Sequence, residues 1–318
     1  MTQRKRFDVA IVGGGMVGNT LACLLADLGF GVVVLERNAP KAFDASDALE
    51  LRVSAISLGS QNVLDAAGIW PRIERMRSAV YRRMQVWDGV SGEEVMFDAT
   101  AFGHSHLGHI VENRLIQRAA FEAAQQQPNV DYVLDADVRG VDVLGGYAQV
   151  RLSDGRNINA QLLVGADGAD STIRQSAGIQ VKRHDYAMKA LVANVETDYP
   201  QQDITWQRFV PTGPEAFLPL PGSHGSLVWY HTAEEVDRLQ ALSPEALHDA
   251  FCRYFPEELG QINRVLGVGS FPLRKQLAEQ YCKPRLALVG DAAHAIHPLA
   301  GQGVNLGIMD AAALAEAL

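Results

Sequence analysis

The chain has 318 residues, of which 47% are hydrophobic, and carries a formal net charge of −9 at pH 7. This length is sufficient for one large hydrophobic core or two moderate ones. The acidic balance, without any cluster of Lys and Arg, excludes a nucleic-acid-binding surface, because phosphate recognition needs such clusters.

The N-terminal segment is basic for its first residues and then passes directly into an apolar strand. It has neither the long apolar core nor the cleavage site of a signal peptide, and no apolar stretch of the chain reaches the length of a membrane span. Cys23, Cys252 and Cys282 are far apart and predict neither a disulfide framework nor a zinc site. We therefore expect a cytoplasmic protein, whose contact with the inner membrane would be peripheral.

A dinucleotide-binding turn is predicted at the start of the chain. Phe7 to Val12 predicts a buried strand, and Met16 to Leu28 predicts a helix. Between them, Gly13, Gly15 and Gly18 form a GxGxxG pattern. Its glycines permit a tight turn, close approach of the backbone to a pyrophosphate, and packing of helix on strand.

A second strand, Gly31 to Leu35, ends at Glu36, which lies 18 residues after Gly18. That carboxylate can accept a hydrogen bond from an adenosine ribose hydroxyl, whereas it would repel a ribose 2′-phosphate. The site therefore disfavours NADP and leaves NAD and FAD open. The alternative is a glycine turn that only lets the helix pack.

The middle of the chain contains a second motif, LLVGADGADSTIR, at residues 162–174. It predicts a strand, a turn that carries Asp167 and Gly168, and a helix capped by Asp170 or Ser171. Taken alone, the motif is equally well explained as an ordinary strand-to-helix connection.

A β-rich region is predicted from about residue 181 to 271, where alternating segments are separated by Pro- and Gly-rich turns. One helix, at 243–254, interrupts these antiparallel strands, and residues 81–97 predict a hairpin that joins them. Trp206, Phe217 and Tyr230 are candidates to cover a substrate ring. For each of them singly, the core of a sheet is the simpler explanation.

The most informative segment is GDAAHAIHPLAGQGVNLG, at residues 290–307. An apolar run at 286–289 leads into Gly290 and Asp291, and a helical pattern begins after Gly303. A carboxylate that leaves a strand can accept from a polyol hydroxyl, while backbone N–H groups at a Gly-rich helix start can face an electron-rich ring. This combination fits the ribityl chain and isoalloxazine of a flavin, and it favours FAD over NAD.

The ordered set GGGMVG, GADGADSTIR and GDAAHAIHPLAGQGVNLG resembles the class A flavoprotein monooxygenases, the aromatic-ring hydroxylases typified by p-hydroxybenzoate hydroxylase. With LRVSAIS from Leu51 and LGHIVEN from Leu107, the resemblance covers essentially the whole chain. The chain is most similar to the ubiquinone-biosynthesis hydroxylases within this class. The phrases TWQRFVPTGPEAFLPLPG and SLVWY favour their demethoxyubiquinol hydroxylase branch over the sister polyprenylphenol hydroxylases.

The resemblance implies an α/β fold in which a Rossmann-like FAD-binding domain holds an inserted β-rich (α+β) substrate domain. We expect residues 1–75, 98–180 and 279–318 to form the discontinuous FAD-binding domain, and residues 76–97 and 181–278 to form the substrate domain. The chain stops inside GIMDAAALAEAL, a strong helix former without a C-cap glycine. Since relatives continue beyond this point, we also expect a C-terminal truncation.

Carried over by position, the resemblance implies a set of FAD contacts from all three motifs. They are Gly13, Gly15, Gly18, Glu36 and Arg37 at the ADP half, Arg52 near the flavin and pyrophosphate, Asp167 and Gly168 in a motif that serves FAD and NAD(P)H, Asp291 on the ribityl chain, and Pro298, Gly301, Gln302, Gly303, Val304, Asn305 and Leu306 along the isoalloxazine. Backbone N–H groups at that last helix start would stabilise negative charge on reduced flavin.

The histidines carry little of this prediction. His104, His106 and His109 have no carboxylate or cysteine companion, so we interpret them as surface or packing residues and expect no metal site. His294 and His297 fall in the flavin-side loop. His297 is the catalytic candidate, as a hydrogen-bonding partner of substrate or flavin and not as a base.

The resemblance implies an FAD-dependent monooxygenase. NAD(P)H reduces the flavin, O₂ adds to give a flavin C4a-hydroperoxide, and a polyprenylated phenol or quinol attacks its distal oxygen, so that no protein nucleophile is required. The alternatives are a sister hydroxylase of the same pathway, a flavin-dependent reductase or dehydrogenase, and a non-catalytic FAD-binding or assembly subunit. A disulfide reductase is disfavoured by the missing CxxC. Assembly into a ubiquinone-biosynthesis complex or a homo-oligomer is a further expectation.

Overall fold

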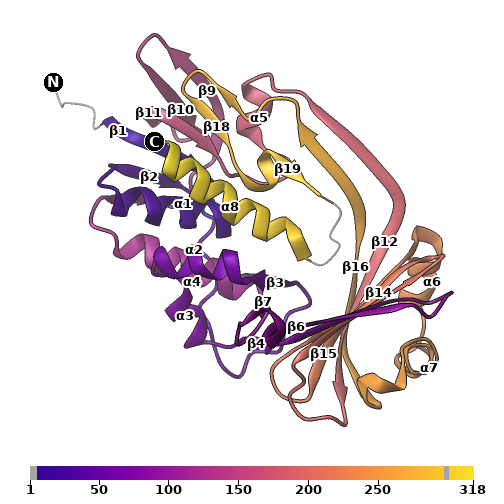
Figure 1. Cartoon of the computed structure of the whole chain (residues 1–318). Coiled ribbons are helices and arrows are strands. Elements are labelled where there is room, and N and C mark those ends of the chain that lie inside the picture. The colour runs from indigo at the N-terminus through magenta and orange to yellow at the C-terminus, as the bar shows by residue number, and fades with distance from the viewer. Residues whose placement is uncertain (1–5, 297–300) are drawn as a thin grey trace.

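The computed structural model describes residues 6–296 and 301–318. Figure 1 shows a helix-rich part that contains both termini and a second, β-rich part, connected by two long strands, β12 (Val181–Thr197) and β16 (Ile262–Ala278). Among the residues that the structure describes, no helix is both long and apolar enough to cross a membrane.

The helix-rich part is built on an eight-stranded sheet with the path β17-β18-β11-β1-β2-β8, to which β10 and β9 add beside β11. Its parallel strands are β1 (Arg6–Val12), β2 (Val32–Leu35), β8 (Val130–Val133), β11 (Asn157–Gly165) and β18 (Leu286–Leu288), and its antiparallel strands are β9 (Val138–Leu144), β10 (Tyr147–Leu152) and β17 (Cys282–Lys283). All four residues of β2 are buried apolar side chains. A continuous apolar run is expected of a parallel strand that is covered on both faces.

Helices cover this sheet. They are α1 (Met16–Asp27), α2 (Leu58–Ala66), α3 (Trp70–Glu74), α4 (Asn113–Gln126), α5 (Thr172–Ser176) and α8 (Gln302–Ala317). In Figure 1, the C-terminal helix α8 lies beside α1 near the other end of the sequence. Ile308 and Ala311 of α8 belong to the same buried cluster as Leu21 and Leu25 of α1. Hydrophobic burial therefore joins the two ends of the chain into one core.

A small sheet and a short turn complete this part. The three-stranded sheet has the order β3-β7-β4, with bounds β3 (Val53–Ser57), β4 (Ala79–Tyr81) and β7 (Gly108–Glu112). The turn η3 (Gly290–Ala292) follows β18.

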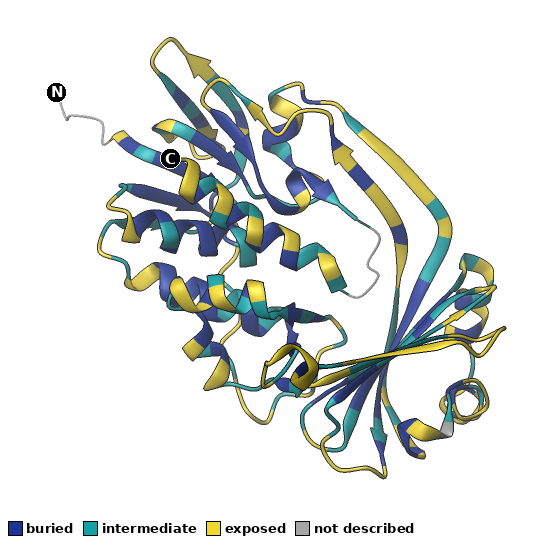
Figure 2. Cartoon of the chain, in the orientation of Figure 1, coloured by how far each residue is buried: buried dark blue, intermediate teal, exposed yellow. Residues whose placement is uncertain are grey.

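The second eight-stranded sheet has the order β19-β16-β12-β15-β14-β13-β5-β6. Its remaining strands are β5 (Arg83–Asp88), β6 (Glu94–Asp98), β13 (Ile204–Val210), β14 (Gly213–Pro219), β15 (His224–Thr232) and β19 (His294–Ala295), and two helices, α6 (Ala233–Gln240) and α7 (Pro244–Tyr254), accompany it. Figure 2 shows dark buried positions in the centre of this sheet and yellow exposed ones along the β5–β6 hairpin and the connecting strands.

Most predicted elements of this region are confirmed. The strands expected at 190–195, 205–210 and 226–230 lie within β12, β13 and β15, and the hairpin expected at 81–97 joins them through the parallel pair of β5 and β13. The prediction of one helix was incomplete, because α6 precedes α7. Thr232 caps α6 by accepting from the backbone N–H of Glu235, a local signal that the strand pattern before it obscured.

We propose that the two large sheets mark the two predicted domains. Residues 181–278 coincide with the stretch from the start of β12 to the end of β16, and β5 and β6 add to the same sheet. The three predicted segments of the other domain supply the helices and the parallel sheet. This support comes from strand pairing, and the predicted boundaries themselves stay a prediction.

Candidate functional site

A cavity of about 600 Å³ lies where the three sequence motifs meet the face of the second sheet. Ten of the predicted site residues line it: Gly15, Arg52, Gly168, Trp206, Tyr230, Asp291, Gly301, Gln302, Gly303 and Val304. The lining of this cavity does not include Gly13, Gly18, Glu36, Arg37, Asp167, Phe217, Asn305 or Leu306. His297 and Pro298 lie outside the described residues.

The N-terminal turn is shaped by glycine at two positions. Gly13 has a positive φ of 105°, and a Cβ there would lie 2.3 Å from the carbonyl oxygen of Ala166. A Cβ at Gly18 would lie 2.0 Å from the carbonyl oxygen of Gly13. These two glycines therefore let β1, α1 and the middle motif approach one another. Gly15 differs, because a Cβ there would meet no atom within 4 Å.

Glu36 closes the turn from the end of β2. Its Oε2 accepts the backbone N–H of Gly14 at 2.6 Å, and its Oε1 accepts that of Asn38 at 3.0 Å. Both carboxylate oxygens are thus held in place beside the start of α1, where backbone N–H groups are available to an anion. The neighbouring Arg37 is exposed and lies 3.6 Å from Asp137.

Asp167 of the middle motif is used inside the protein. Its carboxylate accepts from the Ser171 hydroxyl and from the backbone N–H of Ile173, 3.2 Å away. Burial raises the pKa of Asp167, which these hydrogen bonds partly offset. Ser171 is the helix cap, because its Oγ accepts from the backbone N–H of Arg174 at 3.0 Å. This arrangement leaves Gly168, with φ at 82°, at the cavity wall.

Arg174 is the last residue of the middle motif at residues 162–174, and no role was predicted for it. Its side chain is 1% exposed, and it donates to the carbonyl oxygens of Ala169 at 2.7 Å and Ala292 at 2.8 Å. Burial lowers the pKa of this guanidinium. The arginine fastens the middle motif to η3, and the sequence could not indicate this because Ala292 lies 118 residues away and contributes only backbone.

Asp291 follows β18 and its side chain is accessible from the cavity. In the described part of the chain, its carboxylate accepts no hydrogen bond. Desolvation by the surrounding walls raises the pKa of Asp291, while the positive charges of His294 and Arg52 oppose this rise. Arg52 lines the same cavity. A desolvated carboxylate without a donor is suited to accept from a ligand hydroxyl.

The start of α8 forms another wall of the cavity. Gly301, the N-cap residue, has a left-handed φ of 64°, and Gln302, Gly303 and Val304 begin the helix. The first N–H groups of a helix have no partner within it, and they carry a partial positive charge. They can therefore face a ring that becomes negatively charged.

Asn305 connects α8 to β3. Its Nδ2 donates to the carbonyl oxygen of Ala55 at 2.7 Å, and its Oδ1 accepts the backbone N–H of Ser57 at 3.0 Å. The structure thus places Asn305 behind the wall, where it orients the helix start. Leu306 is exposed.

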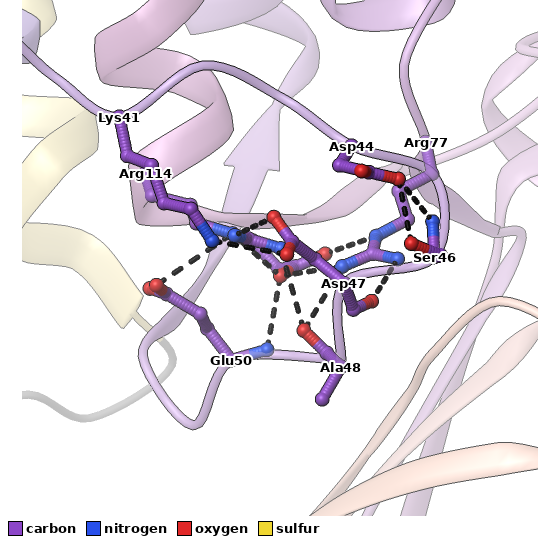
Figure 3. A network of polar contacts seen from close by, with 9 residues as sticks. Lys41, Asp44, Ser46, Asp47, Ala48, Glu50, Arg77 and Arg114 are labelled. Carbon is purple, nitrogen blue, oxygen red and sulfur yellow. Dashed lines mark hydrogen bonds and ion pairs between the residues drawn. The ribbon is translucent and has the colours of Figure 1, made fainter.

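A polar network holds the segment that leads to Arg52 (Figure 3). Glu112, which is 4% exposed, accepts from Arg77 at 2.5 and 3.1 Å and from Arg114 at 3.3 Å. Arg77 donates to the carbonyl oxygen of Asp47 at 2.9 Å, and Glu112 accepts the backbone N–H of Glu50 at 2.9 Å. This network could not be predicted from local sequence patterns, because its members come from three separate segments.

Strand alternation decides which side chains of the second sheet face the cavity. Ser226, Val228 and Tyr230 on β15 line it, as do Ala216 and Leu218 on β14. Since neighbouring side chains on a strand point to opposite faces, Phe217 points the other way, where it is buried in the core cluster with Phe251. Trp206 lies opposite Phe217 in the strand register and packs against that cluster, although it also contributes to the cavity wall.

Two of the three neighbouring histidines, His106 and His109, make ring contacts. The rings of His106 and His109 meet edge to face at 4.7 Å, and His109 packs on Trp70 at 4.8 Å. Burial lowers the pKa of His109 to about 4. His109 therefore stays neutral at pH 7.

The residues of the cavity fit FAD on several independent observations. Glycines 15, 168 and 303 leave open space where a side chain would project. Two helix starts, those of α1 and α8, and the carboxylate of Asp291 lie around one cavity. A pyrophosphate, a polyol chain and a ring that accumulates negative charge match these three features in turn.

Comparison with known proteins agrees with this geometry. The family model described as FAD binding domain matches residues 6–318. The chain is 42% identical to the 3-demethoxyubiquinol 3-hydroxylase of Escherichia coli over 98% of this chain and 79% of that protein. It is 39% identical to the ubiquinone hydroxylase UbiL of Rhodospirillum rubrum over 98% of this chain and 72% of that protein.

Solved structures show the same fold. PqsL of Pseudomonas aeruginosa, described as a probable FAD-dependent monooxygenase, superposes with a TM-score of 0.84 at 26% identity, covering 98% of this chain and 86% of that one. The p-nitrophenol 4-monooxygenase PnpA of Pseudomonas putida has a TM-score of 0.77 at 23% identity, over 98% and 80% of the two chains, and shows the fold alone. The predicted fold class, the FAD cofactor and the monooxygenase assignment are confirmed. The chain therefore belongs to the FAD-binding-domain family of flavin-dependent monooxygenases, to which the ubiquinone-biosynthesis hydroxylases also belong.

Proposed function

We propose that this protein hydroxylates the ring of a polyprenylated phenol or quinol in ubiquinone biosynthesis, with demethoxyubiquinol as its substrate. The names of the relatives at 42% and 39% identity support the substrate class. The observation that carries the proposal is the single cavity in which the wall around Asp291 and α8 continues into the apolar face of the second sheet. Cofactor and ring would meet there.

FAD would be held by residues from all three motifs. Gly13, Gly15, Gly18 and Glu36 would hold its ADP half, with Arg37 nearby, and Arg52 would lie beside the pyrophosphate, near Asp167 and Gly168. Asp291 would accept from the ribityl hydroxyls, and the stretch Gly301, Gln302, Gly303, Val304, Asn305 and Leu306, together with Pro298, would border the isoalloxazine. When bound, FAD supplies the redox chemistry, because it takes electrons from NAD(P)H and passes one oxygen atom of O₂ to the ring.

The protein's own contribution would be binding, orientation and exclusion of water. The ring would lie against Val228, Tyr230 and Leu218, whose apolar surfaces keep water from the site of oxygen transfer. Overall, one ring C–H becomes C–OH, the second oxygen atom of O₂ leaves as water, and NAD(P)H is oxidised. The N–H groups at the start of α8 would stabilise the negative charge of the reduced ring. A hydrogen bond from His297 to substrate or flavin is part of the same proposal.

We also propose that the protein meets its lipid substrate at a membrane surface. The β5–β6 hairpin carries Val90, Val95 and Met96 with exposed fractions of 76%, 55% and 48%. Exposed apolar side chains at a strand edge are suited to insert among lipid headgroups. Flotation with uncharged phosphatidylcholine vesicles tests this, since replacement of Val95 and Met96 by Ser should reduce the bound fraction. Equal binding of wild type and variant would exclude this hairpin as the membrane contact.

The choice among pathway intermediates is tested by turnover. Full-length protein with FAD and NAD(P)H should convert demethoxyubiquinol faster than a prenylated phenol that lacks the later ring substituents, measured by mass spectrometry of the product. Preference for the simpler phenol would instead identify a sister hydroxylase. Protein that binds FAD and turns over neither compound would identify a non-catalytic FAD-binding or assembly subunit.

A further inference from the structure

A buried histidine of the distal motif has a charged partner on α8. His294 is 6% exposed, and its Nε2 lies 2.6 Å from Oδ2 of Asp310. The same Oδ2 accepts the backbone N–H of Gly290 at 2.8 Å. One carboxylate therefore contacts both ends of the segment from Gly290 to His294, which carries Asp291 between them.

The packing around this segment makes its position depend on α8. Gly290 has a positive φ of 59°, and a Cβ at Gly307 would lie 3.2 Å from the Cα of Gly290. The helix thus lies directly on the turn. Since Asp291 and the start of α8 line the same cavity, any loosening between turn and helix would move two walls of the FAD site relative to each other.

Three titratable groups face His294. Asp310 comes from α8, Asp291 comes from η3, and the ring of Tyr281 lies 5.8 Å from that of His294. The hydrogen bond to Asp310 and the charges of both carboxylates raise the pKa of His294, against the opposing effect of burial. Burial and Asp310 together raise the pKa of Tyr281, so that this phenol stays neutral near pH 7.

We propose that His294 and Asp310 are positioning residues for FAD, whose ion pair holds the turn that carries Asp291 against α8 and makes FAD affinity depend on the protonation of His294. This inference rests on the proposed contact of Asp291 with the ribityl chain. Protonated His294 binds Asp310 by charge as well as by hydrogen bond, and its positive charge favours the ionised form of Asp291. Neutral His294 keeps only the hydrogen bond.

The sign of the effect follows from linkage. If protonation of His294 and binding of FAD both favour the fastened turn, each must strengthen the other by the same factor. Bound FAD should therefore raise the pKa of His294. Conversely, raising the pH through that pKa should weaken FAD binding, by about threefold if the pKa rises by about half a unit on binding.

The test is a fluorescence titration of the full chain with FAD between pH 6 and 9. The affinity of wild type for FAD should fall as the pH rises. Asp310→Asn should bind about tenfold more weakly at pH 6, the loss expected for one charge-assisted hydrogen bond, and its pH dependence should be flat. His294→Gln keeps a hydrogen-bond donor without a titrating charge, so its FAD affinity should also be independent of pH. A matched control is His248→Gln, because His248 lies 3.7 Å from Asp249 on α7, outside the cavity lining, and should keep the wild-type profile.

A second measurement does not depend on the stability of the variants. The pKa of His294, followed by NMR of its ring proton in wild type, should be higher with FAD than without it. An unchanged pKa, a wild-type pH profile in His294→Gln, or wild-type affinity in Asp310→Asn would each overturn the proposal while leaving FAD binding intact. Failure of wild type to bind FAD would overturn the proposed function as well.

Discussion

In the unliganded protein, the Asp291 carboxylate lies in surroundings that disfavour its negative charge. Its side chain is accessible from the cavity, yet the low-polarity surroundings raise the pKa of its carboxyl group, and no hydrogen bond to it is found among the described residues. A carboxyl group whose folded pKa lies above its unfolded pKa lowers stability as the pH rises through these values. We therefore expect Asp291 to favour ligand binding while it lowers the stability of the apoprotein.

The corresponding prediction concerns Asp291→Asn. The variant should bind FAD about tenfold more weakly, because it loses a charge-assisted hydrogen bond. Its apoprotein should have a melting temperature at or above that of wild type at pH 7, and this gain should shrink as the pH falls toward 4. Calorimetry and flavin fluorescence check the two parts. Unchanged FAD affinity would remove Asp291 from the site.

Glu112 is the residue on which the Arg52 segment depends. Replacing it by Gln leaves the half-buried Arg77 and Arg114 without their shared carboxylate, which we expect to cost about 3 kcal/mol of unfolding free energy. Urea denaturation measures this loss. As a matched control, Glu196→Gln breaks an exposed pair with Arg264 at 3.0 Å and should cost less than about 1 kcal/mol. Equal losses in both variants would show that the network does not anchor this segment.

At the scale of elements, we expect the glycines in the turn between β1 and α1 to have different roles. Gly13 and Gly18 serve folding, and Gly15 serves FAD binding. A side chain at Gly13 or Gly18 would collide with backbone, whereas one at Gly15 would project into open space at the cavity. Gly15→Ala should therefore keep the wild-type melting temperature and bind FAD at least about tenfold more weakly. Gly13→Ala should instead lose stability by more than about 2 kcal/mol.

A control for this pair is Gly145→Ala, in a turn where a Cβ also meets no atom within 4 Å. It should change neither stability nor FAD affinity. If Gly15→Ala bound FAD like this control, the open space at Gly15 would have no connection with the cofactor.

The face of the second sheet carries a further prediction. Val228 lines the cavity, and Val143 is an exposed apolar residue on β9, far along the sequence. Val228→Phe should raise the KM for the quinol by about tenfold while FAD affinity stays within twofold, because added volume on this face displaces the ring and not the flavin. Val143→Phe should change neither value. A loss of FAD from Val228→Phe would place the flavin against this sheet instead.

At the scale of the whole molecule, the sequence predicted well whatever depends on local patterns. Glycine spacing and apolar runs indicated β1, α1, β18 and the start of α8, because such patterns are encoded within a few residues. The class of fold followed from the family resemblance that the three motifs carry.

Contacts between distant segments could not be predicted in this way. Arg174 donates to the backbone carbonyl of Ala292, and Asp310 contacts both Gly290 and His294. Each contact joins different elements, so no local sequence pattern predicts it. Side chains alternate along a strand, so Phe217 and Leu218 face opposite ways, but alternation does not decide which of them faces the cavity. That choice depends on the helix α7, whose Phe251 packs on the side of Phe217.

The central claim is that one cavity brings FAD, O₂ and a polyprenylated quinol together for hydroxylation. Its most direct test is turnover of demethoxyubiquinol under ¹⁸O₂ by the full-length protein with FAD and NAD(P)H, followed by mass spectrometry. The predicted result is one ¹⁸O atom in the ring hydroxyl of the product. Clean turnover of the quinol with an unlabelled ring would contradict it.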